Sequence, residues 1–152
     1  MQHELSVEID RPIEAVFERT LHDITQWSLT CVEDEIIDEV NGGGVGTRFR
    51  MVTEDRGKRM EFEGIVTQHE PPNLSEAHMA GHYFDINALY VFEDLGGSTR
   101  VTQVATVNGK GFMRLMLMVM GVFMKKSSCD AMQKELASLK RHCEEKIPAA
   151  VA

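Results

Sequence analysis

The architecture of this chain is decided by residues 111–124, which read GFMRLMLMVMGVFM and are apolar apart from Arg114 and two glycines. The stretch continues into an amphipathic segment that ends near Lys146, and Pro148 follows. Apolar side chains at helical spacing, followed by proline, predict one long helix over residues 111–146. No earlier segment reads as a helix of that length, so the rest of the chain is expected to pack against this one.

The predicted helix has two parts with different expected roles. From about Ser128 onward it is amphipathic, and the residues expected to pack on the rest of the fold are Met132, Leu136, Leu139 and Cys143. From Phe112 to Met124 it is apolar nearly all round, which is more than packing on one side requires. We expect this first part to be a lid or wall of a ligand cavity, with Gly121 as a site for a kink.

The segments before the helix read as short strands and two short helices. Residues 3–9 alternate, with Leu5, Val7 and Ile9 on one face, which is the period of a half-buried strand. Glycine-rich and proline-rich turn signals separate the later segments. The predicted helices are 12–22 and 23–29, and the predicted strands are 3–9, 31–40, 46–54, 59–69, 74–80, 84–94 and 99–107.

Consecutive strands joined by short turns imply an antiparallel sheet. A sheet with one apolar face must cover that face, and the long helix is the largest apolar partner in the sequence. We therefore expect an α+β fold in which a curved sheet wraps around the long helix and leaves a hollow between them. Residues 1–147 are expected to form a single domain, and residues 148–152 a C-terminal tail.

Composition excludes several classes of protein. An apolar fraction of 43% and a charged fraction of 26% are ordinary for a globular domain of 152 residues. A formal net charge of -8 argues against a nucleic-acid partner, because phosphate binding needs a basic surface. The longest apolar run, Leu115–Met124, is shorter than the roughly 20 residues that span a bilayer, so no stable membrane insertion is expected.

The cysteines and the N-terminal residues point to the cytoplasm. The chain has three cysteines, an odd number, and no two stand at CxxC spacing, which favours reduced thiols. No cysteine stands in a motif that pairs it with a catalytic histidine, so we do not expect a thiol nucleophile. The first residues lack the basic and apolar regions of a signal peptide.

Several short motifs, taken in order, resemble the START-like helix-grip superfamily (SRPBCC), and most closely its polyketide cyclase/dehydrase and lipid-transport branch. They are VEIDRPIEAVF at 7–17, Trp27, GVGT at 44–47, EPP at 70–72, GGSTRVT at 96–102 and the final long helix. Together they cover nearly the whole chain. The sequence departs from the branch at Gln26-Trp27-Ser28-Leu29, where a Trp-Pro type motif is usual.

The resemblance implies a seven-stranded antiparallel sheet that grips the last helix, with a ligand cavity between them. Members of the superfamily bind lipids, sterols, polyketides or other apolar molecules, and some catalyse cyclisation or dehydration. We expect the cavity to be lined by Phe17, Trp27, Phe49, Met51, Phe62, His78, Tyr90, Phe92, Gln103, Leu117, Met120, Met124 and Ser128.

Three of these residues are expected to orient the ligand. Tyr90 shares a strand face with apolar residues, and a buried tyrosine needs a partner for its hydroxyl. Gln103 is an amide on an apolar strand face, and Gln68 has a similar position in its own strand. Buried amides cost free energy unless they are hydrogen-bonded, so such residues suggest a ligand or water contact. His78 is the third orienting group.

No metal or cofactor is expected. His78 and His82 are four residues apart, but in a strand this places them about 13 Å apart, too far to share one metal ion. The sequence contains no GxSxG motif, P-loop or dinucleotide fingerprint. Catalytic residues are therefore left unassigned.

The expected function is the binding or transport of a small hydrophobic or amphipathic ligand that is lipid-, polyketide- or sterol-like. A cyclase or dehydratase acting on a polyketide-like substrate is one alternative. The other is an interaction or dimerisation module that uses the segment 112–124, because five of the ten methionines lie there and methionine suits adaptable contact surfaces. A homodimer is left open by these observations.

Overall fold

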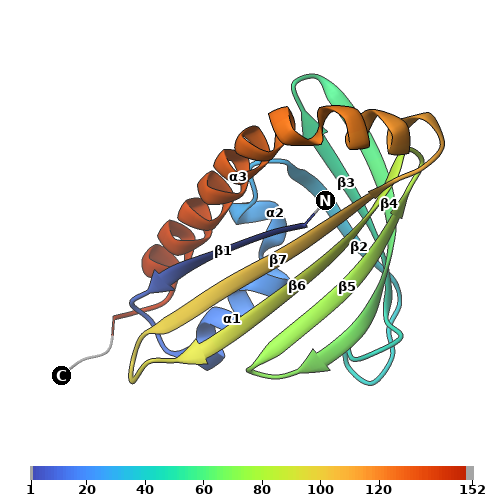
Figure 1. Cartoon of the computed structure of the whole chain (residues 1–152). Helices are drawn as coiled ribbons and strands as arrows, with labels where there is room; N and C mark the ends of the chain where they lie inside the picture. The colour runs from blue at the N-terminus through green and yellow to red at the C-terminus, as the bar shows by residue number, and fades with distance from the viewer. Residues whose placement is uncertain (1, 150–152) are drawn as a thin grey trace.

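The computed structural model describes residues 2–149, with the exception of the side chains of residues 121–125. The elements follow the order predicted from the sequence (Figure 1). They are β1 (Gln2–Ile9), α1 (Ile13–His22), α2 (Ile24–Trp27), β2 (Cys31–Asp38), β3 (Arg48–Asp55), β4 (Lys58–Glu70), β5 (Leu74–Gly81), β6 (Phe84–Asp94), β7 (Thr99–Gly109) and α3 (Phe112–Lys146). Most of the expected tail, residues 150–152, lies outside the described residues.

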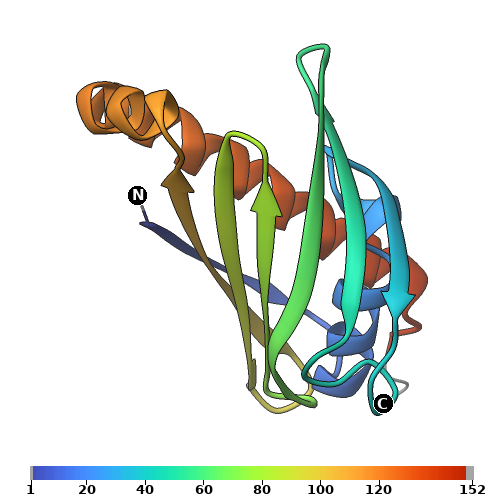
Figure 2. The ribbon, with the colours of Figure 1, turned by 90° about the vertical axis from the view of Figure 1, so that its right-hand side faces the viewer.

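The strands form one antiparallel sheet, which curves around α3 (Figure 2). Its order is β1-β7-β6-β5-β4-β3-β2, so β1 and β2 are the edge strands. In the turn between β3 and β4, Arg56 and Gly57 have positive φ angles of 52° and 77°, as a tight two-residue hairpin requires. The predicted fold class, a curved seven-stranded sheet that grips a long C-terminal helix, is confirmed.

The second half of α3 closes one end of the molecule, which we call the closed end. Its residues Met132, Leu136, Leu139 and Cys143 are buried, as the sequence predicted. They pack with α1, α2, β1, β6 and β7 in one continuous apolar cluster. The other buried members of that cluster are Ile9, Ile13, Val16, Phe17, Trp27, Phe92, Val101 and Ile147.

A second apolar cluster lies on the inner face of β3–β6 and is only partly buried. Its buried members are Phe62, Met79 and Ala88. The side chains packed around them, all partly exposed, are Phe49, Met51, Met60, Phe84, Ile86 and Tyr90. The closest contacts of α3 with the sheet are to β1 and β7, at one side of this surface. We call this inner surface, together with the first half of α3, the open end.

Two glycines let aromatic rings of the open end lie across a neighbouring strand. Phe49 is paired with Gly64, and Phe62 is paired with Gly81. A Cβ atom at Gly64 would lie 2.2 Å from the ring of Phe49, and one at Gly81 would lie 2.6 Å from the ring of Phe62. Glycine in a strand often marks such a close approach. The inner surface of the sheet is therefore lined by aromatic rings rather than by backbone.

The outer face of the sheet is polar and carries ion pairs. Arg50 pairs with Glu61, and Arg59 pairs with Glu33. Val52, whose sheet partners are Glu33 and Glu61, is fully buried among these residues. The apolar clusters of the described residues lie on the inner face, so a ligand-binding surface is to be sought there.

The first half of α3 exposes large apolar side chains. Phe112, Leu115, Met118 and Val119 are all well exposed, Met118 at 75%. The helix changes direction after its first turns (orange in Figure 1) and remains helical through Gly121. Within residues 2–149, no helix is long and apolar enough to cross a membrane. The contacts of this half of α3 with the sheet therefore bury only part of its apolar surface.

Candidate functional site

Two polar side chains face inward where the open end meets the closed end. Tyr90 on β6 and Gln103 on β7 are paired directly across the two strands. Gln103 Oε1 is buried and accepts no hydrogen bond from any described residue. Burial raises the pKa of the Tyr90 hydroxyl, and nearby Glu135 and Cys31 raise it further. A buried amide oxygen without a donor costs free energy, so this position suits a bound molecule that donates a hydrogen bond.

A second inward pair lies on β2 and β3. Cys31 is buried and is paired with Thr53. Thr53 Oγ1 is buried and has no hydrogen-bond partner among the described residues. Burial, together with Asp34 and Glu135, raises the pKa of the Cys31 thiol to about 11. The thiol is therefore protonated at neutral pH and is a poor nucleophile.

Glu135 of α3 interacts with one residue of each pair. Its carboxylate accepts a hydrogen bond from the backbone N–H of Leu29 at 2.7 Å. Burial raises the pKa of Glu135, although hydrogen bonds from the α2–β2 connection act in the opposite direction. Glu135 interacts electrostatically with both Tyr90 and Cys31. We call the resulting group of residues the inner polar site, and its members are Cys31, Thr53, Tyr90, Gln103 and Glu135.

A cysteine and a histidine also meet inside the molecule. Cys129 Sγ on α3 lies 3.5 Å from His3 Nδ1 on β1, and His3 is buried. The two residues are 126 positions apart, so proximity in the sequence could not reveal the contact. It joins α3 to β1 close to the point where the helix passes from the open to the closed end.

The predicted ligand residues fall into distinct groups in the structure. Those that keep part of their surface exposed are Phe49, Met51, Tyr90, Gln103, Leu117 and Ser128. Met120 is more exposed, and the side chain of Met124 lies outside those described. Those with almost no exposed surface, at 2–3%, are Phe17, Trp27, Phe62 and Phe92.

Phe17, Trp27 and Phe92 belong to the packed core of the closed end rather than to an accessible wall. The rings of Phe17 and Phe92 meet edge to face, with centroids 5.0 Å apart. Trp27 Nε1 donates a hydrogen bond to the carbonyl of Thr20 at 3.0 Å. These contacts leave no surface for a ligand, because the closed end uses the short helices to complete its core.

The expected place of His78 in the cavity is corrected by the strand register. His78 is paired with Ile65 and Asn87, whereas its neighbour Met79 packs into the inner cluster. Successive side chains of a strand point to opposite faces, so His78 lies on the outer face. There its Nε2 is 3.7 Å from Asp85 Oδ2.

Three members of the inner polar site were not predicted from the sequence. Glu135 lies between Met132 and Leu136 on the buried face of α3, and a carboxyl group on an apolar helix face is a signal that could have found it. Cys31 and Thr53 lie where a β-bulge shifts the register of β2 and β3 just after Cys31. The bulge breaks the alternation on which strand prediction depends.

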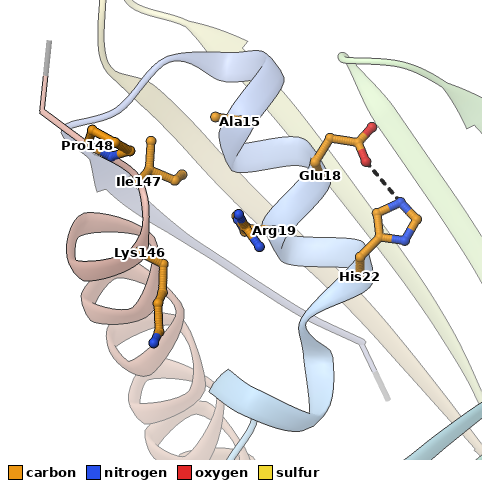
Figure 3. Close-up of a pocket in the computed structure, with 7 residues that line it drawn as sticks. All are labelled: Ala15, Glu18, Arg19, His22, Lys146, Ile147 and Pro148. Atoms are coloured by element: carbon orange, nitrogen blue, oxygen red, sulfur yellow. Dashed lines mark ion pairs between the residues drawn. The ribbon is translucent and has the colours of Figure 1, made fainter.

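A surface pocket lies elsewhere, between α1 and the end of α3 (Figure 3). Its volume is about 450 Å³, and its lining residues are Ala15, Glu18, Arg19, His22, Lys146, Ile147 and Pro148. Glu18 and His22 form an ion pair at 2.9 Å within it. None of the predicted ligand residues lines this pocket, and its charged lining does not suit an apolar ligand.

The inner polar site offers several hydrogen-bonding groups. Within the described part of the chain, the Tyr90 hydroxyl forms no hydrogen bond with a titratable side chain. A general acid or base must be within hydrogen-bond reach of the proton that it moves. The site offers unpaired oxygen atoms beside an apolar surface, which can orient a bound molecule.

Comparison with known proteins identifies solved structures of similar fold. No family model matches the sequence, and no curated protein matches it significantly. A START superfamily protein from Mycobacterium smegmatis is 18% identical, with a TM-score of 0.77 over 95% of this chain and 97% of that chain. The Zhui aromatase/cyclase from Streptomyces sp. R1128 is 12% identical, with a TM-score of 0.77 over 98% and 96%. A protein from Thermus thermophilus is 16% identical, with a TM-score of 0.79 over 97% and 100%.

These similarities extend over nearly the full length of each chain, with TM-scores of 0.77 to 0.79. The chain therefore has the START-like helix-grip fold, as the motifs in its sequence predicted. Function is carried by sites rather than by folds, so the inner polar site and the open end must carry the functional argument.

Proposed function

We propose that this protein binds or transports a small hydrophobic or amphipathic ligand, lipid-, polyketide- or sterol-like, between the inner face of β3–β6 and the first half of α3. The observation that carries the proposal is the apolar cluster of the open end, most of whose side chains stay partly exposed. A ligand would bury that surface, and each Å² of apolar area removed from water contributes about 25 cal/mol.

The inner polar site supports the proposal with a means of orientation. Ligand sites are mainly apolar and hold a few placed polar groups. Tyr90 and Gln103 border the apolar cluster and offer a hydroxyl and an unpaired amide oxygen. The proposed ligand contacts are Phe49, Met51, Tyr90, Gln103, Leu117, Ser128 and Glu135.

The direct test is to release small molecules from the purified protein under denaturing conditions and identify them by mass spectrometry. We expect an apolar molecule in an amount comparable to the protein. An empty protein that also binds no neutral apolar fluorophore would overturn the proposal. We further propose a cytoplasmic setting, since all three cysteines are free.

A dimer interface on the first half of α3 is a second candidate, favoured by its exposed apolar residues. Residues 109–129 contain four lysines or arginines and no aspartate or glutamate. The edge strand β2 is acidic and exposes Ile36 and Ile37. The two surfaces complement each other in charge and apolar character, so the proposed occupant is β2 of a second copy of this chain.

The mass measured by light scattering over a range of protein concentrations tests this candidate. We expect the mass to rise toward twice the chain mass, and Met118→Lys to abolish the rise because Met118 is 75% exposed on this half of the helix. A mass that stays monomeric at every concentration would rule the interface out.

A cyclase or dehydratase is the third candidate, and it has narrower support. Glu135, with its raised pKa, and the Tyr90 hydroxyl interact electrostatically, and the Streptomyces structure of similar fold is an aromatase/cyclase. The absence of a hydrogen bond between titratable groups in the described inner site is the reason that binding is preferred to catalysis here.

A further inference from the structure

We propose that the ligand of the inner polar site is uncharged and carries hydroxyl groups, and that the site excludes carboxylates and other anions. The inference rests on the proposed function, because it names the chemical class of the molecule bound at the same place. Three features carry it: the absence of cations among the described inner side chains, the presence of a carboxyl group and the unpaired oxygen atoms.

Among the described side chains, no lysine or arginine faces the inner polar site. Arg100 of β7 lies 3.1 Å from Glu8, and Lys110, just after β7, lies 2.8 Å from Asp85. On α3, Arg114 is exposed to solvent. An anion that entered the site would find no counter-ion among these described side chains, and an unpaired charge away from water is costly.

The site already contains an acidic group. Glu135 is close enough to Tyr90 and Cys31 to interact electrostatically with both. Its carboxylate is held by the backbone N–H of Leu29 at 2.7 Å, so it cannot turn away from the site without losing that bond. A ligand carboxylate here would be next to a like charge, which disfavours the ionised form of one of the two groups.

The unpaired oxygen atoms match hydroxyl groups. Gln103 Oε1 can only accept a hydrogen bond, and Thr53 Oγ1 can accept or donate one. A ligand hydroxyl both donates and accepts, so it can pair with either atom and with the Tyr90 hydroxyl. A carboxylate only accepts, so it would leave Gln103 Oε1 without a donor.

The experiment compares three anthracenes of nearly equal size: the neutral alcohol anthracene-9-methanol, the anion anthracene-9-carboxylate and the purely apolar 9-methylanthracene. Binding is followed by their fluorescence at about pH 8, where the carboxylic acid is ionised. We expect the alcohol to bind at least ~10-fold more tightly than the carboxylate, which corresponds to about 1.4 kcal/mol.

Two variants, each with a control, assign the cause. Glu135→Gln keeps an acceptor for Leu29 and removes the charge, so it should raise the affinity for the carboxylate by roughly 3–10-fold. Glu145→Gln, on the exposed side of the same helix, should leave that affinity unchanged. Gln103→Leu should weaken binding of the alcohol by roughly 3–10-fold and leave binding of 9-methylanthracene unchanged.

Each outcome bears on a different claim. If the carboxylate binds the wild-type protein as tightly as the alcohol, the inference is overturned while the proposed function stands. If Glu135→Gln has no more effect than Glu145→Gln, charge exclusion by Glu135 is overturned. If none of the three anthracenes binds, the proposed function itself is overturned.

Discussion

The closed end and the open end of this molecule both contain apolar side chains, but they bury those side chains to different extents. Both place apolar side chains of the sheet and of α3 toward each other. At the closed end α1, α2 and the second half of α3 bury those side chains almost completely, Leu139 to 0% exposure. At the open end the first half of α3 leaves the inner surface of β3–β6 partly exposed. Apolar surface that a fold creates and does not bury is most simply explained by a partner that buries it.

The largest difference between the two ends should appear when the same residue type is shortened in each half of α3. Leu139→Ala removes a fully buried side chain of the closed end and should lower the free energy of unfolding by about 2–5 kcal/mol. Leu117→Ala, in the half-buried open end, should cost less than about 1 kcal/mol and weaken ligand binding. Chemical denaturation measures both, and equal losses of stability would contradict the division into two ends.

The carboxylate of Asp23 and its hydrogen-bond partners also stabilise the closed end. Asp23 Oδ2 lies 2.9 Å from His142 Nε2 and 3.2 Å from Arg19. Burial tends to raise the pKa of Asp23, but the hydrogen bonds from His142 and Arg19 together outweigh it and lower the pKa below its ordinary value of 3.8. The folded state therefore gains stability from Asp23 above pH 3.8 and loses it as the pH falls through the lowered folded value.

Asp23→Asn should consequently lower the free energy of unfolding at neutral pH by roughly 1–3 kcal/mol. The difference from the wild-type protein should shrink at acid pH, because protonation of Asp23 removes the same charge. Urea denaturation at several pH values measures this difference in the free energy of unfolding. Asp130→Asn, on the exposed side of α3, is the control. A difference that stayed constant down to the acid transition would show that Asp23 does not contribute through its charge.

A small effect is also expected where a glycine of the open end is replaced. Gly64→Ala would place a Cβ atom 2.2 Å from the ring of Phe49, so the ring must move. Because Phe49 is only partly buried it can move toward its exposed side, and we expect a loss of about 1 kcal/mol, at the lower limit for overpacking. Ligand affinity should change more than stability does. A loss comparable to that of Leu139→Ala would mean that the open end is packed as tightly as the closed end.

The order of the elements and the division of α3 could be predicted from the sequence because both depend on local patterns. The face of a strand residue is predictable only while the alternation is unbroken. Between Val66 and Gln68 the register of β4 shifts, so Gln68 bonds with Glu76 instead of lining the inner face. His69 packs near the ring of Phe17 instead, with centroids 5.7 Å apart.

Long-range proximity could not be predicted at all. The inner polar site joins β2, β3, β6, β7 and α3, and no local pattern shows that Glu135 is near both Tyr90 and Cys31. His78 and Tyr90 were both predicted to contact the ligand, yet only Tyr90 faces inward. The difference follows from one residue of register, since a shift by one sends every side chain to the opposite face.

The central claim is that the inner surface of the open end binds an apolar ligand. It is tested most directly by titrating the neutral fluorophore 1-aminoanthracene into the wild-type protein, Ile86→Asn and Ile65→Asn. Ile86 is part of the inner cluster, whereas Ile65 is exposed on the outer face, so the two variants make the same change on opposite sides of the sheet. We predict saturable binding that Ile86→Asn weakens by about 10-fold or more and Ile65→Asn leaves unchanged. Equal effects of the two variants, or no saturable binding by the wild-type protein, would contradict the claim.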